Sequence, residues 1–296
     1  MQLITWNVQW FCGLDGVIDL ARVLRNARAM TDFDVLCLQE VAVNYPRLQG
    51  DASHDQPALL RDMLPGFEVC FGAAVDELAP DGRSRQRFGN LIASRLPVAQ
   101  VQHHSLPYPA DTSVRSMPRL ATSATLLAPW GPLRVMTTHL EYYSPRMRMA
   151  QTQELRRLHA QASAQALQPP LCDASGGPFQ AKPHTVDCLI TADFNFEPTS
   201  DEYRSMLADN GDAPRLFDCW RLVHGERPHD PTFRLHDRSY GPLPIACDFV
   251  FASAGVAPRV RRIEVELQTR ASDHQPVLLE LDDAAEATSR PHAGGL

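Results

Sequence analysis

Short apolar runs recur along most of the chain and are separated by turn-forming residues. Runs of five to nine apolar or small residues bounded by Gly, Pro, Asn and Asp are typical of β-strands. Each of these runs therefore predicts a strand, at residues 2–8, 34–39, 67–72, 89–94, 120–128, 133–139, 186–192, 246–252, 260–267 and 276–281.

A second periodicity predicts helices between some of these strands. Apolar residues recur at every third or fourth position over 17–30, which is the spacing of one helix face. Similar segments lie at 56–64 and 145–166, and the latter has proline in its first turn, where a helix tolerates it. A short helix is predicted after Thr199, which with Glu202 matches a capping box.

The number and order of these elements predict the fold class. Strands outnumber helices, and the runs 120–128 and 133–139 are joined by a short turn containing "PWG". This pattern favours an α+β fold with two packed β-sheets and helices on the outside. We find no internal repeat and no linker, so a single domain is expected over 1–281. Residues 168–185 contain four prolines and two glycines and predict a surface loop insertion, and the polar tail 282–296 is predicted to be disordered.

Composition places the chain among ordinary globular proteins. Of its 296 residues, 44% are hydrophobic and 21% are charged, which is enough apolar surface for a large core. There is no apolar run of about 18 residues, so no membrane span is expected. The first predicted strand leaves no room for a signal peptide, and the seven cysteines form no CxxC pair. We therefore expect reduced cysteines and a monomeric, cytoplasmic protein.

The charge balance disfavours one class of function. The net charge is −7, from 28 basic and 35 acidic residues, so the protein does not coat nucleic acid with a basic surface. All basic residues except Lys182 are arginines, a usage that a GC-rich genome also produces. Arginine can bind phosphate through two nitrogens at once. Two clusters, Arg83, Arg85 and Arg87 in "RSRQRFG" and Arg115 and Arg119 in "SVRSMPRLA", leave room for a local positive cleft.

Polar residues interrupt the apolar runs at or near their ends. Taken alone, any one of them is more commonly a hydrogen-bonded core residue. Together they would be costly to bury without a shared task, and strand ends in a layered fold meet at a common edge. The set consists of Asn7, Glu40, His139, Asp193, Asn195, Asp248, Asp273 and His274.

The stretch "TADFN" has a pattern of its own. Asp193 and Asn195 are two positions apart, so on a strand their side chains would project to the same side. Phe194 between them would then point into the core. A carboxylate and a carboxamide side by side could serve as a base for water and a donor to a phosphoryl oxygen.

The chemistry of the set points to a metal-assisted hydrolase. Glu40, Asp193 and Asp273 offer the oxygen ligands that suit Mg²⁺ or Mn²⁺ rather than zinc. Asp248 could orient the ring of His274. The chain has neither a GxSxG nor a Walker pattern, which argues against a serine hydrolase or a P-loop NTPase. Carboxylates, imidazoles and a divalent cation together describe hydrolysis of a phosphoester.

The ordered motifs resemble a known family. "TWNVQ", "LQEV", "GNLIASRLPV", "THL" followed by "RMAQ", "ADFN", "CDFVFAS" and "SDHQPV" are similar to those of the endonuclease/exonuclease/phosphatase superfamily and span nearly the whole chain. That superfamily includes exonuclease III-like and DNase I-like nucleases, sphingomyelinases and inositol-polyphosphate phosphatases. The resemblance implies a four-layer α/β/β/α sandwich, with two mixed sheets packed face to face and the site at one edge.

The resemblance also implies a role for each matching position. Glu40 would be the principal metal ligand, supported by Asn7, with Asp273 as a further carboxylate at the metal. Asp193 would orient or deprotonate the attacking water, and Asn195 would steady the phosphate.

The remaining matches concern the phosphate. His139 stands where the family has His or Tyr near the scissile phosphate, and Asp248 with His274 resembles the pair whose imidazole contacts a phosphate oxygen. Arg148 matches a recurrent arginine on the following helix, for which a structural ion pair is at least as good an interpretation. Contacts with substrate phosphates are also hypothesised for Arg83, Arg85, Arg87 and Arg119.

Three functions remain open at this point. The first is a nuclease that cleaves phosphodiester bonds of DNA or RNA with Mg²⁺ or Mn²⁺, and family frequencies favour it slightly. The second is a phosphodiesterase or phosphatase acting on a small-molecule or lipid phosphoester, such as an inositol phosphate or a sphingomyelin. The third is a non-catalytic binding module, which is disfavoured because every metal and proton-transfer position is filled.

Overall fold

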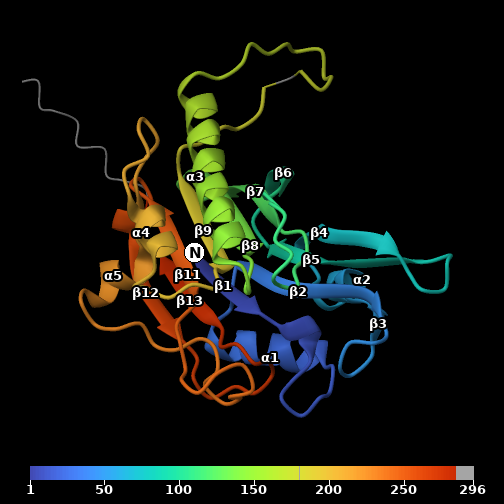
Figure 1. The fold of residues 1–296 in the computed structure, drawn as a ribbon. Coiled ribbons are helices and arrows are strands. Elements are labelled where there is room, and N and C mark those ends of the chain that lie inside the picture. Colours follow the sequence, from blue (N-terminus) through green and yellow to red (C-terminus); the bar gives the residue numbers. More distant parts are fainter. Residues whose placement is uncertain (180, 285–296) are drawn as a thin grey trace, which may run out of the picture.

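The computed structural model describes residues 1–179 and 181–284, and its ribbon is drawn in Figure 1. The strands are β1 Gln2–Asn7, β2 Val35–Tyr45, β3 Ala52–Asp55, β4 Glu68–Leu78, β5 Arg85–Ser94, β6 Val98–Ser105, β7 Leu120–Ala128, β8 Gly131–His139, β9 Cys188–Asp193, β10 Leu216–Asp218, β11 Asp248–Ser253, β12 Val260–Val265 and β13 Val277–Leu281. The helices are α1 Leu20–Met30, α2 Gln56–Met63, α3 Pro145–Leu167, α4 Asp201–Leu207 and α5 Cys219–His224, with short 3₁₀ turns at Gln9–Phe11 and Ala257–Arg259.

The strands form two mixed sheets. One has the order β12-β13-β1-β2-β5-β4, with β3 paired to β2, and the other has the order β10-β11-β9-β8-β7-β6. In each sheet one central pair is parallel, β1 with β2 and β8 with β9, and the other pairs are antiparallel. The predicted class of two packed mixed sheets with outer helices is therefore confirmed.

Apolar side chains fill the space between the two sheets and the space between each sheet and its outer helices. Leu3, Val35 and Ile92 of the first sheet meet Leu126 and Val135 of the second in the central core. The side chains next to Leu3 in β1 point to the opposite face of the sheet, because successive side chains of a strand alternate between its two faces.

The outer contacts complete a sandwich of four layers. Val23 and Leu24 of α1 cover the outer face of the first sheet, and Leu155 and Leu158 of α3 cover that of the second. Figure 1 shows α1 and α3 on opposite sides of the two sheets.

Polar side chains cap the starts of the helices, and one of these caps differs from the predicted one. Asp19, Asp55 and Ser144 each accept a backbone N–H of the first turn of α1, α2 and α3. The capping box predicted at Thr199 is wrong, because the side chain that accepts the N–H of Tyr203 is that of Ser200. The helix expected from residue 17 begins at Leu20, since Asp19 caps it there.

Several elements were not predicted from the sequence. They are β3, β6 and β10 and the helix α5, and β2, β4 and β5 extend beyond their apolar runs. Strand β6 lies at a sheet edge and keeps several polar side chains exposed, so it has no apolar run. β10 and α5 contain three and six residues, which is too short for a period to show.

The expected loop and tail carry little regular structure among the residues described. Residues 168–179 and 181–187 contain no helix and no extended strand, and most of them are exposed. Most of the predicted disordered tail lies outside the described residues, but Asp282 and Asp283 are described and pair with Arg261 and the N-terminal ammonium. No helix within 1–179 or 181–284 has the length and apolarity needed to cross a membrane.

The topology brings four strand termini to one edge. Asn7 ends β1 next to Gln39 of β2, and Asp193 ends β9 between His139 of β8 and Asp248 of β11 in the strand register. The carboxyl ends of β1, β8 and β9 therefore lie close together, and open α/β sheets place ligand sites at such ends.

Candidate active site

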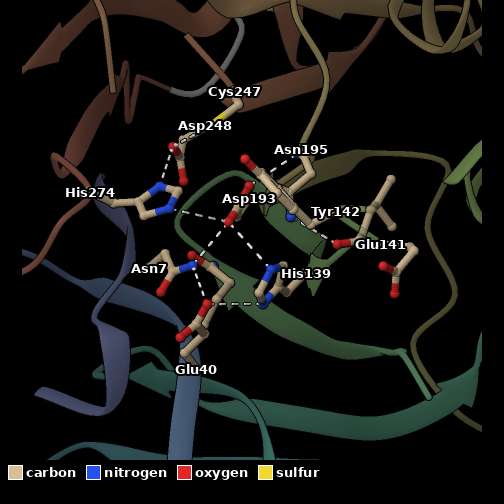
Figure 2. Close-up of polar contacts among 12 residues, drawn as sticks. Asn7, Glu40, His139, Glu141, Tyr142, Asp193, Asn195, Cys247, Asp248 and His274 are labelled. Carbon is tan, nitrogen blue, oxygen red and sulfur yellow. Dashed lines mark hydrogen bonds and ion pairs between the residues drawn. The ribbon is translucent and has the colours of Figure 1, made fainter. Parts of the chain in front are cut away.

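Asp193 is the centre of the polar cluster at this edge. Its side chain is 1% exposed, and its Oδ2 accepts the Nδ2–H of Asn7 at 2.9 Å. The Nε2 atoms of His139 and His274 lie 3.4 and 3.5 Å from the same oxygen. Figure 2 shows these three side chains converging on Asp193 from separate segments. One carboxylate oxygen is thus shared by three groups that the sequence separates widely.

The environment of Asp193 suits proton exchange near neutral pH. Burial raises the pKa of Asp193 to about 6, assisted by the negative charge of Asp248 and opposed by the charge of His274. A carboxylate with a pKa close to the working pH can accept a proton and release it again.

Glu40 stands beside Asp193 and is held in an unusual backbone conformation. It lies in a bulge of β2, between Leu38 and Val41, with φ of 60°. A positive φ is disfavoured for a residue with a side chain, so the surrounding structure must hold it. Its Oε1 accepts the Nδ2–H of Asn7 at 3.0 Å, so Asn7 bridges the Glu40 and Asp193 carboxylates.

Asp248 and His274 form an oriented pair. The Nδ1 of His274 is 2.9 Å from Oδ2 of Asp248, and the ring of Phe233 stacks on the imidazole at 4.3 Å with an interplanar angle of 17°. Burial lowers the pKa of His274, but the charges of Asp248 and Asp193 outweigh it and raise the pKa well above its usual value. His274 is therefore a fixed imidazolium whose Nε2 faces Asp193.

His139 has the opposite charge state. Burial and the nearby Arg119 hold the pKa of His139 well below its usual value, so its ring is neutral. Its Nδ1 lies 3.7 Å from Oε1 of Glu40 and its Nε2 3.4 Å from Asp193. A neutral imidazole carries no charge and has a single N–H to donate, so it neutralises neither of the two carboxylates.

Asn195 lies beyond the end of the strand, whereas the sequence pattern placed it on the strand with Asp193. The strand β9 ends at Asp193, and Asn195 turns into the left-handed region with φ of 53°. Its backbone N–H donates to Oδ1 of Asp193 at 3.0 Å, and its Nδ2 donates to the carbonyl of Leu140. Both side chains line the same cleft, and Phe194 between them is fully buried.

The carboxylates fit a hard cation. Burial raises the pKa of Glu40, and burial raises that of Asp273 to about 6, with the Glu40 charge contributing to the latter. Asp273 is buried and Glu40 is partly buried, and two such carboxylates that repel each other are stabilised when a cation lies between them. Carboxylate oxygens are the ligands that Mg²⁺ and Mn²⁺ prefer, so the residues present fit such an ion. Ligand atoms of Glu40, His139 and Asp193 also lie within 4.8 Å of one another.

Arg119 lies in the wall of the cleft and is only 6% exposed. Its Nη2 is 3.5 Å from Oε2 of the fully buried Glu141. Among the described residues, the Nε and Nη1 of Arg119 have no hydrogen-bond partner. A buried guanidinium with unpaired nitrogens is costly unless an anion occupies the site.

The structure does not bring the other candidate arginines to the cleft. Arg148 donates to Glu202 and to the carbonyls of Glu141 and Tyr142, which is the structural ion pair weighed above. Arg85 pairs with Asp76 and Arg87 with Asp55. Arg83 is exposed, and none of Arg83, Arg85 and Arg87 lines the cleft.

The sequence pattern did not predict the aromatic residues that line the cleft. The cavity has a volume of about 590 Å³. Its polar lining includes Glu40, His139, Asp193, Asn195, Asp273 and His274, and its aromatic lining consists of Trp10, Tyr45, Phe88, Tyr142, Tyr143, Phe233 and Tyr240. They come from five separate segments, so no spacing connects them. The only local signal is the pair Tyr142 and Tyr143, which closely follows His139 in "THLEYY".

A two-sheet sandwich with carboxylates, imidazoles and a carboxamide at one edge describes the class of phosphoester hydrolases suggested by the motifs. A model of the endonuclease/exonuclease/phosphatase family matches residues 4–274, and the chain belongs to this family. Members of the family are phosphoester hydrolases and are generally dependent on divalent metals. A search of curated proteins gives no match.

Solved structures with the same fold are similar over most of the chain. An endonuclease/exonuclease/phosphatase from Beutenbergia cavernae is 25% identical, with a TM-score of 0.70 over 95% of this chain and 71% of that one. A mannosyl-6-phosphatase of Bacteroides thetaiotaomicron is 17% identical, with a TM-score of 0.63 over 95% and 99%. A 3′ phosphatase from Neisseria, bound to a product DNA hairpin, is 20% identical, with a TM-score of 0.60 over 95% and 99%.

Proposed function

We propose that the protein is a divalent-metal-dependent hydrolase of phosphodiesters, with Glu40 and Asp273 holding Mg²⁺ or Mn²⁺. The observation that carries the proposal is the convergence of Asn7, His139 and His274 on a single oxygen of Asp193. A bound cation would polarise the phosphoryl group and offset its charge.

In this proposal the protein's own groups divide the work at the phosphate. Asp193 accepts a proton from the attacking water, helped by its raised pKa. The imidazolium of His274, held by Asp248, donates to a phosphoryl oxygen, and Asn195 lines the same cleft beside them. Arg119 supplies the unpaired guanidinium nitrogens that a phosphate oxygen would satisfy.

Two substrate classes remain within this proposal, and one observation separates them. A nuclease that holds an extended strand needs several cations along its groove. Of the described residues that line the cleft, only Arg115 and Arg119 are arginines, and no lysine lines it. This scarcity of cations favours a small phosphoester over a long nucleic acid as the substrate, although family frequencies slightly favour a nuclease.

A panel of substrates tests the proposal. We expect hydrolysis of bis-p-nitrophenyl phosphate, or of at least one of single-stranded DNA, duplex DNA, abasic DNA, RNA, inositol phosphates and sphingomyelin, in the presence of Mg²⁺ or Mn²⁺. Chelation with EDTA should abolish it, and added metal should restore it. No turnover of any substrate with either metal would support the binding-module alternative and refute the proposal. Turnover that EDTA leaves unaffected would refute the metal dependence.

A further inference from the structure

One wall of the cleft is apolar and aromatic. Trp10, Tyr45, Leu48, Val75 and Met117 pack around Phe88, and all six line the cavity that contains Glu40 and Asp193. We call these six residues the aromatic trough. All but Phe88 are partly exposed, so they form a surface that a ligand can reach.

The polar atoms of the trough are already satisfied by the protein. The indole N–H of Trp10 donates to the carbonyl of Gln49 at 2.9 Å, and the hydroxyl of Tyr45 donates to Oε1 of Glu77 at 3.0 Å. The rings of Tyr45 and Phe88 meet edge to face at 6.1 Å and 84°. The side chains of the trough therefore offer a ligand ring, alkyl and thioether surface rather than hydrogen-bonding groups.

The charge around the trough excludes a further phosphate there. Glu77 lines the cleft beside Tyr45, and the arginines of the neighbouring β5 strand, Arg85 and Arg87, are paired with carboxylates. A polyanionic chain that continued past the scissile phosphate in this direction would meet the carboxylate of Glu77, and the nearby exposed Arg47 and Arg83 do not line the cavity. An uncharged group that ends the substrate on this side fits these charges best.

Ring walls favour a flat aromatic group over an acyl chain. Aromatic pairs gain from edge-to-face or offset contacts beyond the area that they bury, and a methionine thioether adds a favourable contact with a ring edge. An alkyl chain gains only from the buried area. A cavity of about 590 Å³ is large enough for a phosphate together with one ring system.

We propose that the substrate is a phosphoester whose terminal group is a flat, uncharged aromatic ring, and that this ring lies in the aromatic trough while its phosphate lies at Glu40 and Asp193. This inference rests on the proposed phosphoester site. It goes beyond it by assigning the group attached to the phosphate, and by limiting the substrate to one that carries no second phosphate on that side.

Binding of phosphonates tests the inference without requiring turnover. The probes are methylphosphonate, 1-naphthylphosphonate and octylphosphonate, titrated calorimetrically in the presence of Mg²⁺. We expect naphthylphosphonate to bind more tightly than methylphosphonate by about tenfold or more, as expected when a ring leaves water for an apolar wall. The affinity for octylphosphonate should lie between the affinities for these two phosphonates.

A double variant, Leu48→Gln with Met117→Gln, should reduce this ratio several-fold and leave the affinity for methylphosphonate unchanged. The backbone N–H and C=O of Leu48 make the hydrogen bonds of its turn and its side chain makes none, and both replacements keep the approximate size of the side chain. The matched control is Leu78→Gln, because Leu78 is 58% exposed on β4 and does not line the cleft. The control should bind all three phosphonates as the unmodified protein does.

The outcomes separate this inference from the proposed function. A ratio near one, a ratio that the double variant leaves intact, or no binding of any phosphonate overturns the aromatic trough as a ligand site. Octylphosphonate that binds as tightly as naphthylphosphonate assigns the trough to an alkyl chain and also overturns the proposal. Failure of the proposed function shows separately, as the absence of metal-dependent turnover of every phosphoester.

Discussion

Replacing Asp193 with asparagine should separate activity from stability. Asparagine has almost the same shape as aspartate but cannot accept a proton at neutral pH, so a general base is lost while the packing is kept. We expect kcat to fall by roughly 10² to 10⁴-fold, the usual contribution of a positioned base. If Asp193 only capped the end of β9, the variant would instead lose stability and keep much of its turnover.

The effect on stability can be worked out from the pKa. That of Asp193 rises from 3.8 to about 6 in the folded protein, mainly because of burial. This difference of about two units corresponds to about 3 kcal/mol. Because the folded pKa is raised, the associated stability is fully present below 3.8 and is lost as the pH rises through about 6. The variant lacks this group and does not share the loss.

The measurement is urea unfolding in EDTA, compared between wild type and Asp193→Asn at about pH 4 and about pH 7.5. Between these pH values, the free energy of unfolding of the wild type should fall relative to the variant by up to about 3 kcal/mol. Saturating Mg²⁺ should reduce this difference, because a nearby cation stabilises the ionised carboxylate. A variant with near-normal kcat, or one that loses activity in proportion to its stability, would refute the assignment of Asp193 as the base.

Other substitutions test neighbouring parts of the site. Phe194→Ala should lower the free energy of unfolding by roughly 3–5 kcal/mol in urea titrations, because the fully buried ring packs against Phe196, Phe249 and Phe251; a loss below about 1 kcal/mol would contradict this. Glu40→Ala should weaken Mg²⁺ binding in calorimetric titrations, and an unchanged affinity would remove Glu40 from the metal ligands. Asp248→Asn should lower turnover while leaving the thermal midpoint nearly unchanged, because it disturbs the orientation of His274; matched losses of both would indicate a structural pair. Replacing Arg83, Arg85 and Arg87 together with Gln should leave the KM for a small diester unchanged, and a rise in KM confined to polyanionic substrates would return them to the site.

The residues at strand ends could be predicted because their signal is local. Asp193, Asn7 and His139 each end an apolar run, and the two-residue period of a strand together with the common edge of a layered fold brings such ends together. The conformation of Glu40 could not be predicted. Its positive φ arises from a bulge in the pairing of β2 with β5, which no run of residues in β2 encodes by itself.

The arginines show why charge clusters mislead. Arg85 and Arg87 stand two positions apart in the sequence and resemble a phosphate-binding cluster. Their partners are Asp76, on the other strand of the β4–β5 hairpin, and Asp55, at the end of β3. Cross-strand pairing depends on register, which is known only once the hairpin has formed. The aromatic trough could not be predicted for a related reason, because its six residues come from distant segments of the chain.

The place of β1 in its sheet has a consequence for how the protein folds. β1 lies between β2 and β13, so residues 2–5 pair with residues 277–280 from the far end of the chain. Closing a loop of this length costs entropy before any contact repays it, and folds rich in such distant pairs form slowly. During synthesis the first strand must wait for nearly the whole chain before its second neighbour exists. Because Asn7 and His274 flank the same carboxylate, the polar cluster around Asp193 should assemble in a late step of folding, after both strands are in place.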